Sequence, residues 1–198
     1  YREGIEAITA EDIAYAEEIG YVIKLLAIAK RTGSGIEVRV HPALVAKSHP
    51  LSNISSNNNA IYVKGEPVGE LMFYGPGAGG DPTSSAVISD LIAASSGSWG
   101  GRTTDPSPCS VSQIGDIEGR YYIRLQATDR FGVLAGISRA FANKRVSIAA
   151  VVQKETIGNI STIVILIHRV KERNLRAAVA AIKKLPVVHR VCNVIRIL

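Results

Sequence analysis

The sequence predicts an α+β protein built from two stretches of unlike composition, and three observations support this. Residues 121–197 alternate between strand-like and helix-like periodicity. Between Tyr74 and Asp90, a cluster of glycines separates a strand-like run from a helical one. The segment Ser95–Asp116 between these two regions is rich in Ser, Gly, Thr and Pro and shows no periodicity. The expected division is therefore a first domain at residues 1–95, a linker at 96–119 and a second domain at 120–198.

The composition excludes several classes of protein. The chain has 198 residues, of which 46% are hydrophobic, enough for a sizeable core. No run of 18 uncharged apolar residues occurs, so no membrane span is predicted, and the first residues, Tyr-Arg-Glu, are not typical of a signal peptide. The two cysteines, Cys109 and Cys192, give neither a disulfide framework nor metal-ligand spacing. We therefore expect no metal site and a reducing, cytoplasmic location.

The charge is distributed unevenly along the chain. Residues 1–119 hold 8 Lys/Arg against 14 Asp/Glu, a balance of −6, whereas residues 120–198 hold 15 against 3, a balance of +12. Such asymmetry indicates two differently charged units. The basic part could face nucleic acid, an acidic partner surface or the acidic part of the same chain. A solvated basic face with no partner is the alternative interpretation.

The first expected helix spans residues 10–19. Thr9 is a suitable N-cap, and Asp12 three residues later completes a near capping box. We expect the helix to bury Ile13 and Ala16 and to end at Gly20 in a left-handed conformation.

Four strands are expected in the rest of the first domain, at residues 21–30, 36–44, 62–63 and 71–74. The first two flank a turn at residues 32–35, and the last two flank the turn Gly65-Glu66-Pro67. Lys24 interrupts the first strand, and we interpret it as a lysine that pairs or extends to solvent at a strand edge, in preference to a catalytic one. The pattern predicts an antiparallel or mixed sheet with helices at its ends.

The glycine-rich stretch Tyr74–Asp90 reads YGPGAGGDPTSSAVISD. A strand at residues 68–74 should precede the glycines, and a helix should follow with Asp81 as N-cap and Pro82 at its first position. A backbone without side chains allows close approach of a ligand, and a helix N-terminus adds amide donors. The stretch therefore predicts either a ligand-contacting turn or a tight structural turn.

A complete dinucleotide fingerprint is rejected for this stretch. Gly75, Gly77 and Gly80 fit the pattern G-x-G-x-x-G. The Rossmann motif also needs a second parallel strand after the helix, with an acidic residue about 20 positions on. Here the helix runs into the linker, and the nearest later acidic residue, Asp105, lies inside it.

The glycine-rich stretch resembles the end of the catalytic domain of homoserine dehydrogenases. The resemblance rests on residues 74–83 and on Ser-Ala-Val at 85–87. Further matching stretches stand upstream in the same order: Glu3-Gly4-Ile5, Ile8-Thr9, Asp12-Ile13, Gly20, residues 23–27, His49-Pro50-Leu51 and Asn59-Ala60-Ile61. The resemblance implies that Gly79, with Gly77 beside it, contacts an NAD(P) cofactor that another domain mainly binds.

The second domain shows the order βαββαβ, which is the split βαβ of ferredoxin-like folds. Its expected elements are residues 121–127, 132–144, 146–154, 161–168, 172–185 and 191–197. RNA-recognition modules share this topology and stack bases on aromatic residues of their central strands. The third expected strand has no aromatic residue, and Tyr121 and Tyr122 point to opposite faces of the first, so only one could stack. We therefore expect no nucleic-acid partner.

The segment Thr128–Leu134 resembles the Asp-x-x-Gly-Val-Leu signature of ACT domains, which commonly bind amino acids. Amides at the start of the helix near Gly132, Val133 and Leu134 can bind a carboxylate, and Asp129 can accept hydrogen bonds from an ammonium group. The expected effector site is completed by Ile148 from a neighbouring copy of the chain. Phe131 stands where the family often has Pro. The alternative interpretation is that Asp129 only caps the helix.

Together the two resemblances imply the reversible NAD(P)H-dependent reduction of aspartate semialdehyde to homoserine, in threonine and methionine biosynthesis. They also imply an amino-acid effector, with threonine the first choice, and a homo-oligomer formed through ACT domains.

The resemblance also bears on what this stretch can do alone. The family's Rossmann domain, catalytic lysine and acidic partner precede the Glu3-Gly4-Ile5 segment, so we assign no catalytic residue and expect these 198 residues alone to be inactive. A stand-alone amino-acid-binding regulatory protein is the alternative. Trp99 is expected to anchor the linker against a neighbouring domain.

Overall fold

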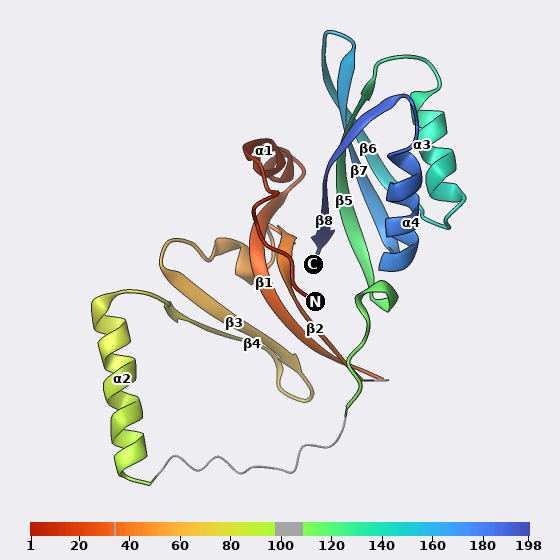
Figure 1. The fold of residues 1–198 in the computed structure, drawn as a ribbon. Helices are drawn as coiled ribbons and strands as arrows, with labels where there is room; N and C mark the ends of the chain where they lie inside the picture. The colour runs from red at the N-terminus through yellow and green to blue at the C-terminus, as the bar shows by residue number, and fades with distance from the viewer. Residues whose placement is uncertain (34, 98–108) are drawn as a thin grey trace. The chain divides into compact units, whose positions relative to one another are not determined.

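The computed structural model describes residues 1–33, 35–97 and 109–198 (Figure 1). Residues 1–46 and 109–198 form one compact unit, called unit 1, and residues 47–108 form unit 2. Helices and strands mix throughout, so the predicted α+β class is confirmed. Trp99 lies outside the described residues. Among the described residues, no helix is both long and apolar enough to cross a membrane.

Unit 1 is built on a six-stranded sheet with the order β1-β2-β8-β5-β7-β6 (Figure 1). Its elements are α1 (Ala10–Glu18), β1 (Tyr21–Thr32), β2 (Gly35–Ala46), η2 (Ile114–Asp116), β5 (Glu118–Thr128), α3 (Val133–Ala142), β6 (Ile148–Ile157), β7 (Ile160–Lys171), α4 (Glu172–Ile182) and β8 (Val188–Ile197). The elements from β5 to β8 follow the predicted order βαββαβ, which is confirmed.

The hairpin of β1 and β2 extends the sheet of the C-terminal elements. β2 runs parallel to β8, with Ala43 aligned to Arg196 and Leu44 to Ile197. The amide of Leu198 donates to the carbonyl of Leu44 at 2.9 Å. Residues 1–46 thus belong to the same compact unit as the C-terminal elements, and the boundary between the two units follows Ala46. The division into residues 1–95, 96–119 and 120–198 stays a prediction.

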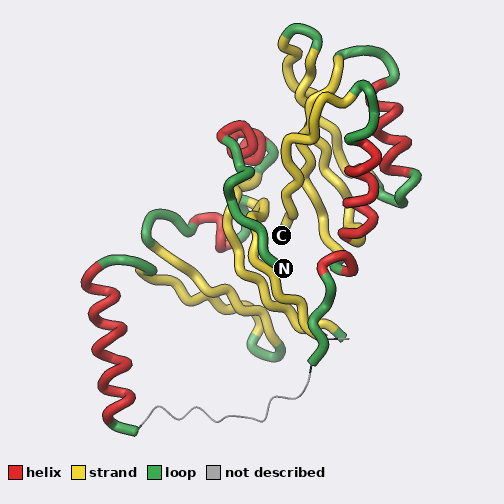
Figure 2. The backbone as a smooth tube through the Cα atoms, viewed as in Figure 1, coloured by secondary structure: helices red, strands yellow, loops and turns green. Residues whose placement is uncertain are grey.

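Hydrophobic side chains cover both faces of this sheet. Figures 1 and 2 show α3 and α4 on one face, where Tyr121, Phe141 and Leu175 belong to the main core. Tyr122 belongs to a second cluster on the other face, together with Ala16 of α1. The two tyrosines thus point to opposite faces, as predicted. Because both are buried, neither is free to stack a base.

The N-terminus of α1 has the predicted capping box. Thr9 is the N-cap, its hydroxyl accepts from the amide of Asp12, and the Asp12 carboxylate accepts from the amide of Thr9. Gly20 follows the helix with φ of +85°, as expected. The prediction that Ile13 is buried is wrong, since it is 48% exposed. Asp12 and Ala16, one turn apart, form the buried face because Asp12 has a buried cationic partner.

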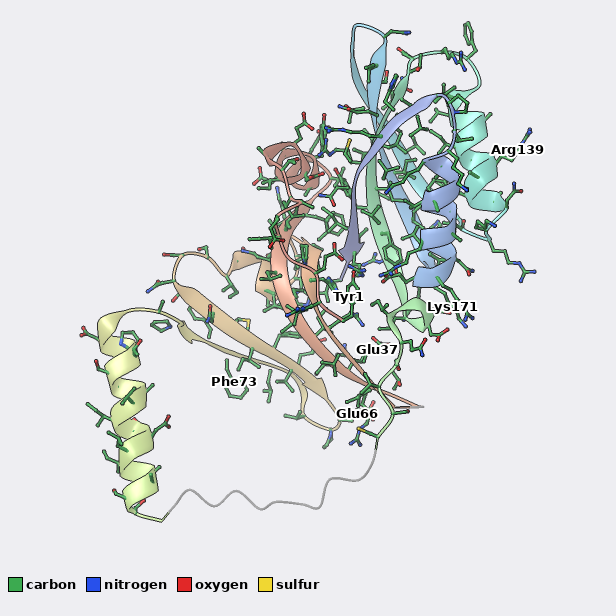
Figure 3. All side chains as sticks on the ribbon, in the orientation of Figure 1. Tyr1, Glu37, Glu66, Phe73, Arg139 and Lys171 are labelled. Carbon is green, nitrogen blue, oxygen red and sulfur yellow. The ribbon has the colours of Figure 1, made fainter. Side chains whose placement is uncertain are left out.

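Unit 2 consists of η1 (Pro50–Asn53), an antiparallel hairpin of β3 (Asn58–Gly65) and β4 (Gly69–Pro76), and α2 (Gly80–Ser95). The hairpin confirms the two strands expected around the turn at residues 65–67. No residue of α2 is buried, and apolar side chains such as Ile61, Phe73 and Leu91 are mostly exposed (Phe73 is labelled in Figure 3). β4 pairs with β3 alone in its sheet, so α2 is not part of a βαβ unit among the described residues.

Candidate functional site

The glycine-rich turn follows β4 and is tied to the segment that precedes β3. The amide of Gly77 donates to the carbonyl of Asn57 at 2.7 Å. The side-chain Nδ2 of Asn57 donates to the carbonyl of Ala78 at 3.1 Å. Asn57, directly before β3, therefore holds the turn after β4 by two hydrogen bonds.

Two glycines of this turn are required for different physical reasons. A Cβ on Gly77 would lie 2.1 Å from Nδ2 of Asn59, so a side chain there would displace the asparagine. Gly79 has φ of +127°, which other residues rarely adopt. Gly75 differs from both, because a Cβ there would meet no atom within 4 Å.

The prediction that Asp81 caps α2 is wrong. The N-cap is Gly79, without a side-chain cap, and the helix begins at Gly80, so Asp81 and Pro82 lie inside its first turn. The unusual backbone of Gly79 redirects the chain early enough that Gly80 is already helical. The first amides of α2 consequently donate no hydrogen bond to an N-cap side chain.

The turn fits one part of the implied NAD(P) cofactor. Residues 77–80 are exposed and offer backbone almost without side chains, which suits a flat ring placed against it. Within the described residues of unit 2 the cationic side chains other than histidine are Lys47 and Lys64, and Lys64 pairs with Glu70 at 2.8 Å. The described turn thus has no dedicated cation for the cofactor's phosphates.

The second candidate site is a cavity of about 190 Å³ at the start of α3. Asp129, Gly132, Val133 and Leu134 all line it, so the structure brings four of the predicted effector residues together. Gly132 is the N-cap of α3 in a left-handed conformation, with φ of +83°. Ile148 is not among the residues that line the cavity; it lies at the start of β6, opposite Ile167 of β7.

Two further polar residues of this cavity were missed by the sequence reasoning. Nε2 of Gln153 donates to Oδ1 of Asp129 at 3.4 Å and to Oγ of Ser161 at 3.3 Å. Gln153 comes from β6 and the buried Ser161 from β7. Their position depends on the register of two strands, which has no signal in the local sequence.

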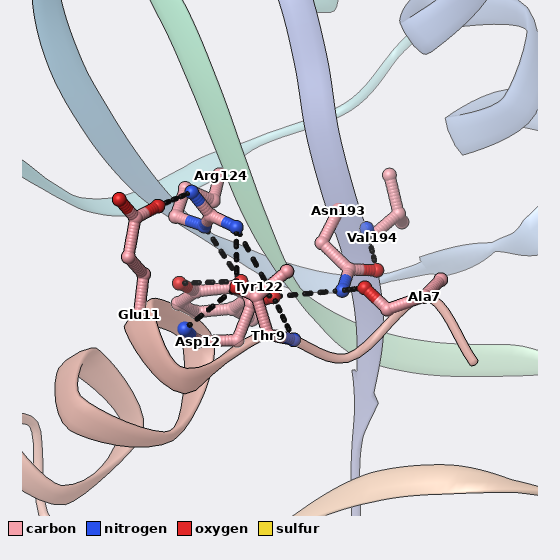
Figure 4. Close-up of polar contacts among 8 residues, drawn as sticks. All are labelled: Ala7, Thr9, Glu11, Asp12, Tyr122, Arg124, Asn193 and Val194. Carbon is pink, nitrogen blue, oxygen red and sulfur yellow. Dashed lines mark hydrogen bonds and ion pairs between the residues drawn. The ribbon is translucent and has the colours of Figure 1, made fainter. Parts of the chain in front are cut away.

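A buried polar network joins α1 to β5 and β8 (Figure 4). Nε of Arg124 donates to Oδ1 of Asp12 at 2.6 Å, and a terminal nitrogen of Arg124 donates to Oγ1 of Thr9 at 2.9 Å. Nδ2 of Asn193 donates to Oδ2 of Asp12 at 3.0 Å, and Glu11 forms an ion pair with Arg124 from the exposed side. Asp12 and Arg124 are both fully buried.

Hydrogen bonding keeps Asp12 ionised in this network. Burial acts to raise its pKa, but the hydrogen bonds from Arg124, Asn193 and Thr9 outweigh it, and the pKa is lowered overall. Burial, together with the Asp12 charge, raises the pKa of the neighbouring Tyr122. The network therefore contains a carboxylate and a guanidinium with a neutral phenol beside them. In the sequence, the feature that could have indicated this network is Arg124, a charged residue inside an otherwise apolar strand.

A second network holds the N-terminal segment to β8. The Glu172 carboxylate accepts from Nε of Arg196 at 2.9 Å and from Arg176 one turn along α4. Another nitrogen of Arg196 donates to Oε2 of Glu3 at 2.7 Å. Burial acts to raise the pKa of Glu172, but the two arginines lower it overall.

The comparisons with known proteins agree with this geometry. Residues 121–187 match the ACT domain family, and with the fold and the cavity this defines the C-terminal part as an ACT domain. Residues 1–92 match the homoserine dehydrogenase family. The chain belongs to the homoserine dehydrogenase family and corresponds to the C-terminal part of such enzymes.

Individual relatives match over almost the whole chain. Homoserine dehydrogenase of Synechocystis sp. is 40% identical over 210 residues, which is 99% of this chain and 48% of the relative. That of Corynebacterium glutamicum is 38% identical over 206 residues, 100% of this chain and 46% of the relative. The crystal structure of a homoserine dehydrogenase from Thiobacillus denitrificans superposes with a TM-score of 0.88 at 39% identity, covering 99% of this chain and 47% of that one. The chain spans about half the length of the curated relatives it matches.

Proposed function

We propose that this chain is the C-terminal portion of an oxidoreductase that reversibly reduces aspartate semialdehyde to homoserine with NAD(P)H, in the cytoplasm. The observation that carries the proposal is the similarity to homoserine dehydrogenases over 99% of the chain, which includes both candidate sites. The stand-alone regulatory protein is less well supported, because residues 1–92 match the dehydrogenase family and not a sensor.

The glycine-rich turn would form one wall of the nicotinamide site. The cofactor supplies hydride transfer when it is bound. Gly79 would lie against its ring without a side chain, and Gly77 beside it would bring the backbone close, with Asn59 next to its own missing Cβ. Asn57 and the backbone of Gly77 hold the turn in place by two hydrogen bonds. The role of this segment is therefore to orient the ring and exclude water from it, and no residue of the turn transfers a proton.

The cavity at the start of α3 would bind an amino-acid effector, with threonine the first choice. The amides of Val133 and Leu134 can donate to the carboxylate, and the exposed Asp129 can accept from the ammonium group. Gln153 already donates a hydrogen bond to Asp129, so it orients the side-chain carboxylate of Asp129 toward the cavity. Ser161 adds a hydroxyl that suits the polar side chain of threonine.

Assembly would occur through β6, which would bring Ile148 of one copy to the site of another. In the six-stranded sheet β6 is the outermost strand of the ACT part and its described partner is β7, whereas β8 pairs with β2 at Arg196 and Ile197. An open edge strand favours pairing with a second copy. Val151 on this strand is 40% exposed.

The proposed assembly is tested by the mass of the 198-residue chain in solution. We expect a dimer that Val151→Lys weakens, because a charge would enter the new interface. Val68→Lys, at an exposed apolar residue outside β6, is the matched control and should leave the dimer intact. A strictly monomeric wild type at high concentration would contradict the assembly.

The enzymatic function is tested by comparing two forms of the protein. The 198-residue chain alone should not reduce aspartate semialdehyde with NADPH. A form that also includes the upstream part present in full-length relatives should reduce it and respond to threonine. If the longer form binds threonine with full stoichiometry and shows no reduction, the regulatory alternative holds.

A further inference from the structure

A basic cavity of about 510 Å³ lies at the end of α3 remote from Asp129. Lys144 and Arg145 line it from the segment after α3, and Lys171 and Arg173 line it from the junction of β7 and α4. Figure 3 shows Lys171 at the start of α4. The cavity is distinct from the proposed effector site, because α3 begins at one and ends at the other.

The positive charge of this cavity is largely uncompensated. Its lining contains no acidic residue. Within the part of the chain that the structure describes, the side chains of Lys144, Arg145 and Lys171 make no hydrogen bond or ion pair. Arg173 pairs with Asp116 at 3.0 Å, but both side chains are more than half exposed, so the pair is weak.

Folding alone does not account for the position of two of these cations. Lys144 and Arg145 follow the C-terminus of α3, where positive charge is favourable. Lys171 is the N-cap of α4 and Arg173 lies in its first turn, where positive charge opposes the helix dipole. Glu172 between them does not neutralise them, since its buried carboxylate binds Arg196 and Arg176.

The chemistry of the lining defines the ligand. Lysine and arginine bind phosphate through charged hydrogen bonds, and four of them line an open hollow that is larger than one phosphate needs. Asn143 and Asn174 add polar groups, and no lining residue is aromatic, so a base would find no stacking partner. We propose that this cavity binds a small anion that carries two or more phosphate groups. The proposal gives part of the +12 balance of residues 120–198 a specific partner.

Calorimetric titration of the 198-residue chain with inorganic pyrophosphate tests the proposal. We expect one pyrophosphate per chain, weaker binding of orthophosphate, and affinity that falls with added salt. Lys144→Gln and Lys171→Gln should each weaken binding about tenfold through the loss of one charged hydrogen bond. Lys184→Gln removes an exposed charge beyond the other end of α4 and should leave the affinity unchanged.

Thermal unfolding separates binding from folding in these variants. Lys171→Gln should unfold at the same or a higher temperature without ligand, because it removes a cation from a helix N-terminus. The absence of binding at millimolar pyrophosphate and low salt would overturn the proposal. The proposal would also be overturned if Lys184→Gln lost as much affinity for pyrophosphate as Lys144→Gln and Lys171→Gln do. Tighter binding of a glutamate-rich peptide than of pyrophosphate would overturn it as well.

Discussion

Arg124 of β5 donates from Nε to Oδ1 of Asp12 in α1 at 2.6 Å, although 112 residues separate them along the chain. Both side chains are fully buried, and Asn193 of β8 donates to the same carboxylate. The pair therefore fastens the segment before β1 to the ACT sheet. Because Glu3 is also held by Arg196, the N-terminal residues and the ACT domain form one packed unit.

Asp12→Ala should destabilise the 198-residue chain by about 3–5 kcal/mol, because it leaves Arg124 buried without its carboxylate. Urea unfolding followed by circular dichroism measures the change. Glu11→Ala is the matched control: its side chain is 59% exposed, so its loss should cost about 0–1 kcal/mol.

A double-mutant cycle that combines Asp12→Ala with Arg124→Met separates the contribution of the ion pair from that of side-chain packing. The double variant with Asp12→Ala should be more stable than the sum of the two single losses predicts, because no unpaired charge is left. Additive losses would show that the two side chains contribute independently.

The stability of the chain should fall as the pH drops below about 6.5, the ordinary pKa of histidine. Burial lowers the pKa of His41, the positive charges of Arg196 and Arg39 lower it further, and the carbonyl of Pro42 and the charge of Glu3 act in the opposite direction. Nε of Arg39 donates to Nε2 of His41 at 3.1 Å, so that nitrogen must be unprotonated.

The sign follows from the direction of the shift. The unfolded chain takes up a proton near pH 6.5 and the folded chain does so at lower pH, so stability present above pH 6.5 is lost as the pH falls toward the folded pKa of His41. Urea unfolding at pH 7.5, 6.5 and 5.5 measures this. His41→Gln should flatten the dependence, whereas His168→Gln, an exposed control, should retain it. An unchanged slope in His41→Gln would contradict the assignment.

In the complete enzyme, Gly79→Val should lower cofactor affinity and turnover, because a branched side chain would fill the space beside the nicotinamide. It would also strain a backbone with φ of +127°. Steady-state kinetics with varied NADPH, together with the unfolding temperature, measures both effects.

Gly75→Ala is the control for this substitution, since it lies in the same stretch with open space around it and should leave the kinetics unchanged. If Gly79→Val kept wild-type cofactor affinity and turnover with the fold intact, the turn would have a structural role alone.

Asp129→Ala should weaken threonine binding by about ten- to a hundredfold, corresponding to the loss of a charged hydrogen bond of roughly 1.5–3 kcal/mol. Calorimetric titration of the 198-residue chain with threonine and related amino acids measures it. The whole chain is needed because isolated residues 120–198 would expose Tyr122 and its neighbours in the second hydrophobic cluster.

Glu118→Ala removes an exposed acidic residue at the opposite end of β5 and should leave the affinity unchanged. No heat with any amino acid at millimolar concentration, in a chain shown to be dimeric, would leave the domain with a role in assembly.

The sequence by itself determined the features that depend on neighbouring residues. The capping box joins Thr9 to Asp12, three positions along the chain, so its two hydrogen bonds could be predicted directly. The order βαββαβ followed from periodicity within each element. Gly132 and Asp129 are close in the sequence, and the short loop between them brings both to one cavity. The start of α2 was misplaced by two residues because the backbone angle of Gly79 has no local sequence signal.

Tertiary structure alone decided which distant elements meet. The pairing of β2 with β8 joins residues about 150 positions apart, and it makes the hairpin of β1 and β2 part of the same sheet as the ACT strands. Tertiary packing also buried Asp12 instead of Ile13, because Arg124 of β5 offers a partner on that face of the helix. Gln153 and Ser161 reached the cavity through strand register. Local hydrogen bonds and periodicity act over a few residues, whereas strand pairing and buried charge pairs depend on which surfaces fit after the chain has folded.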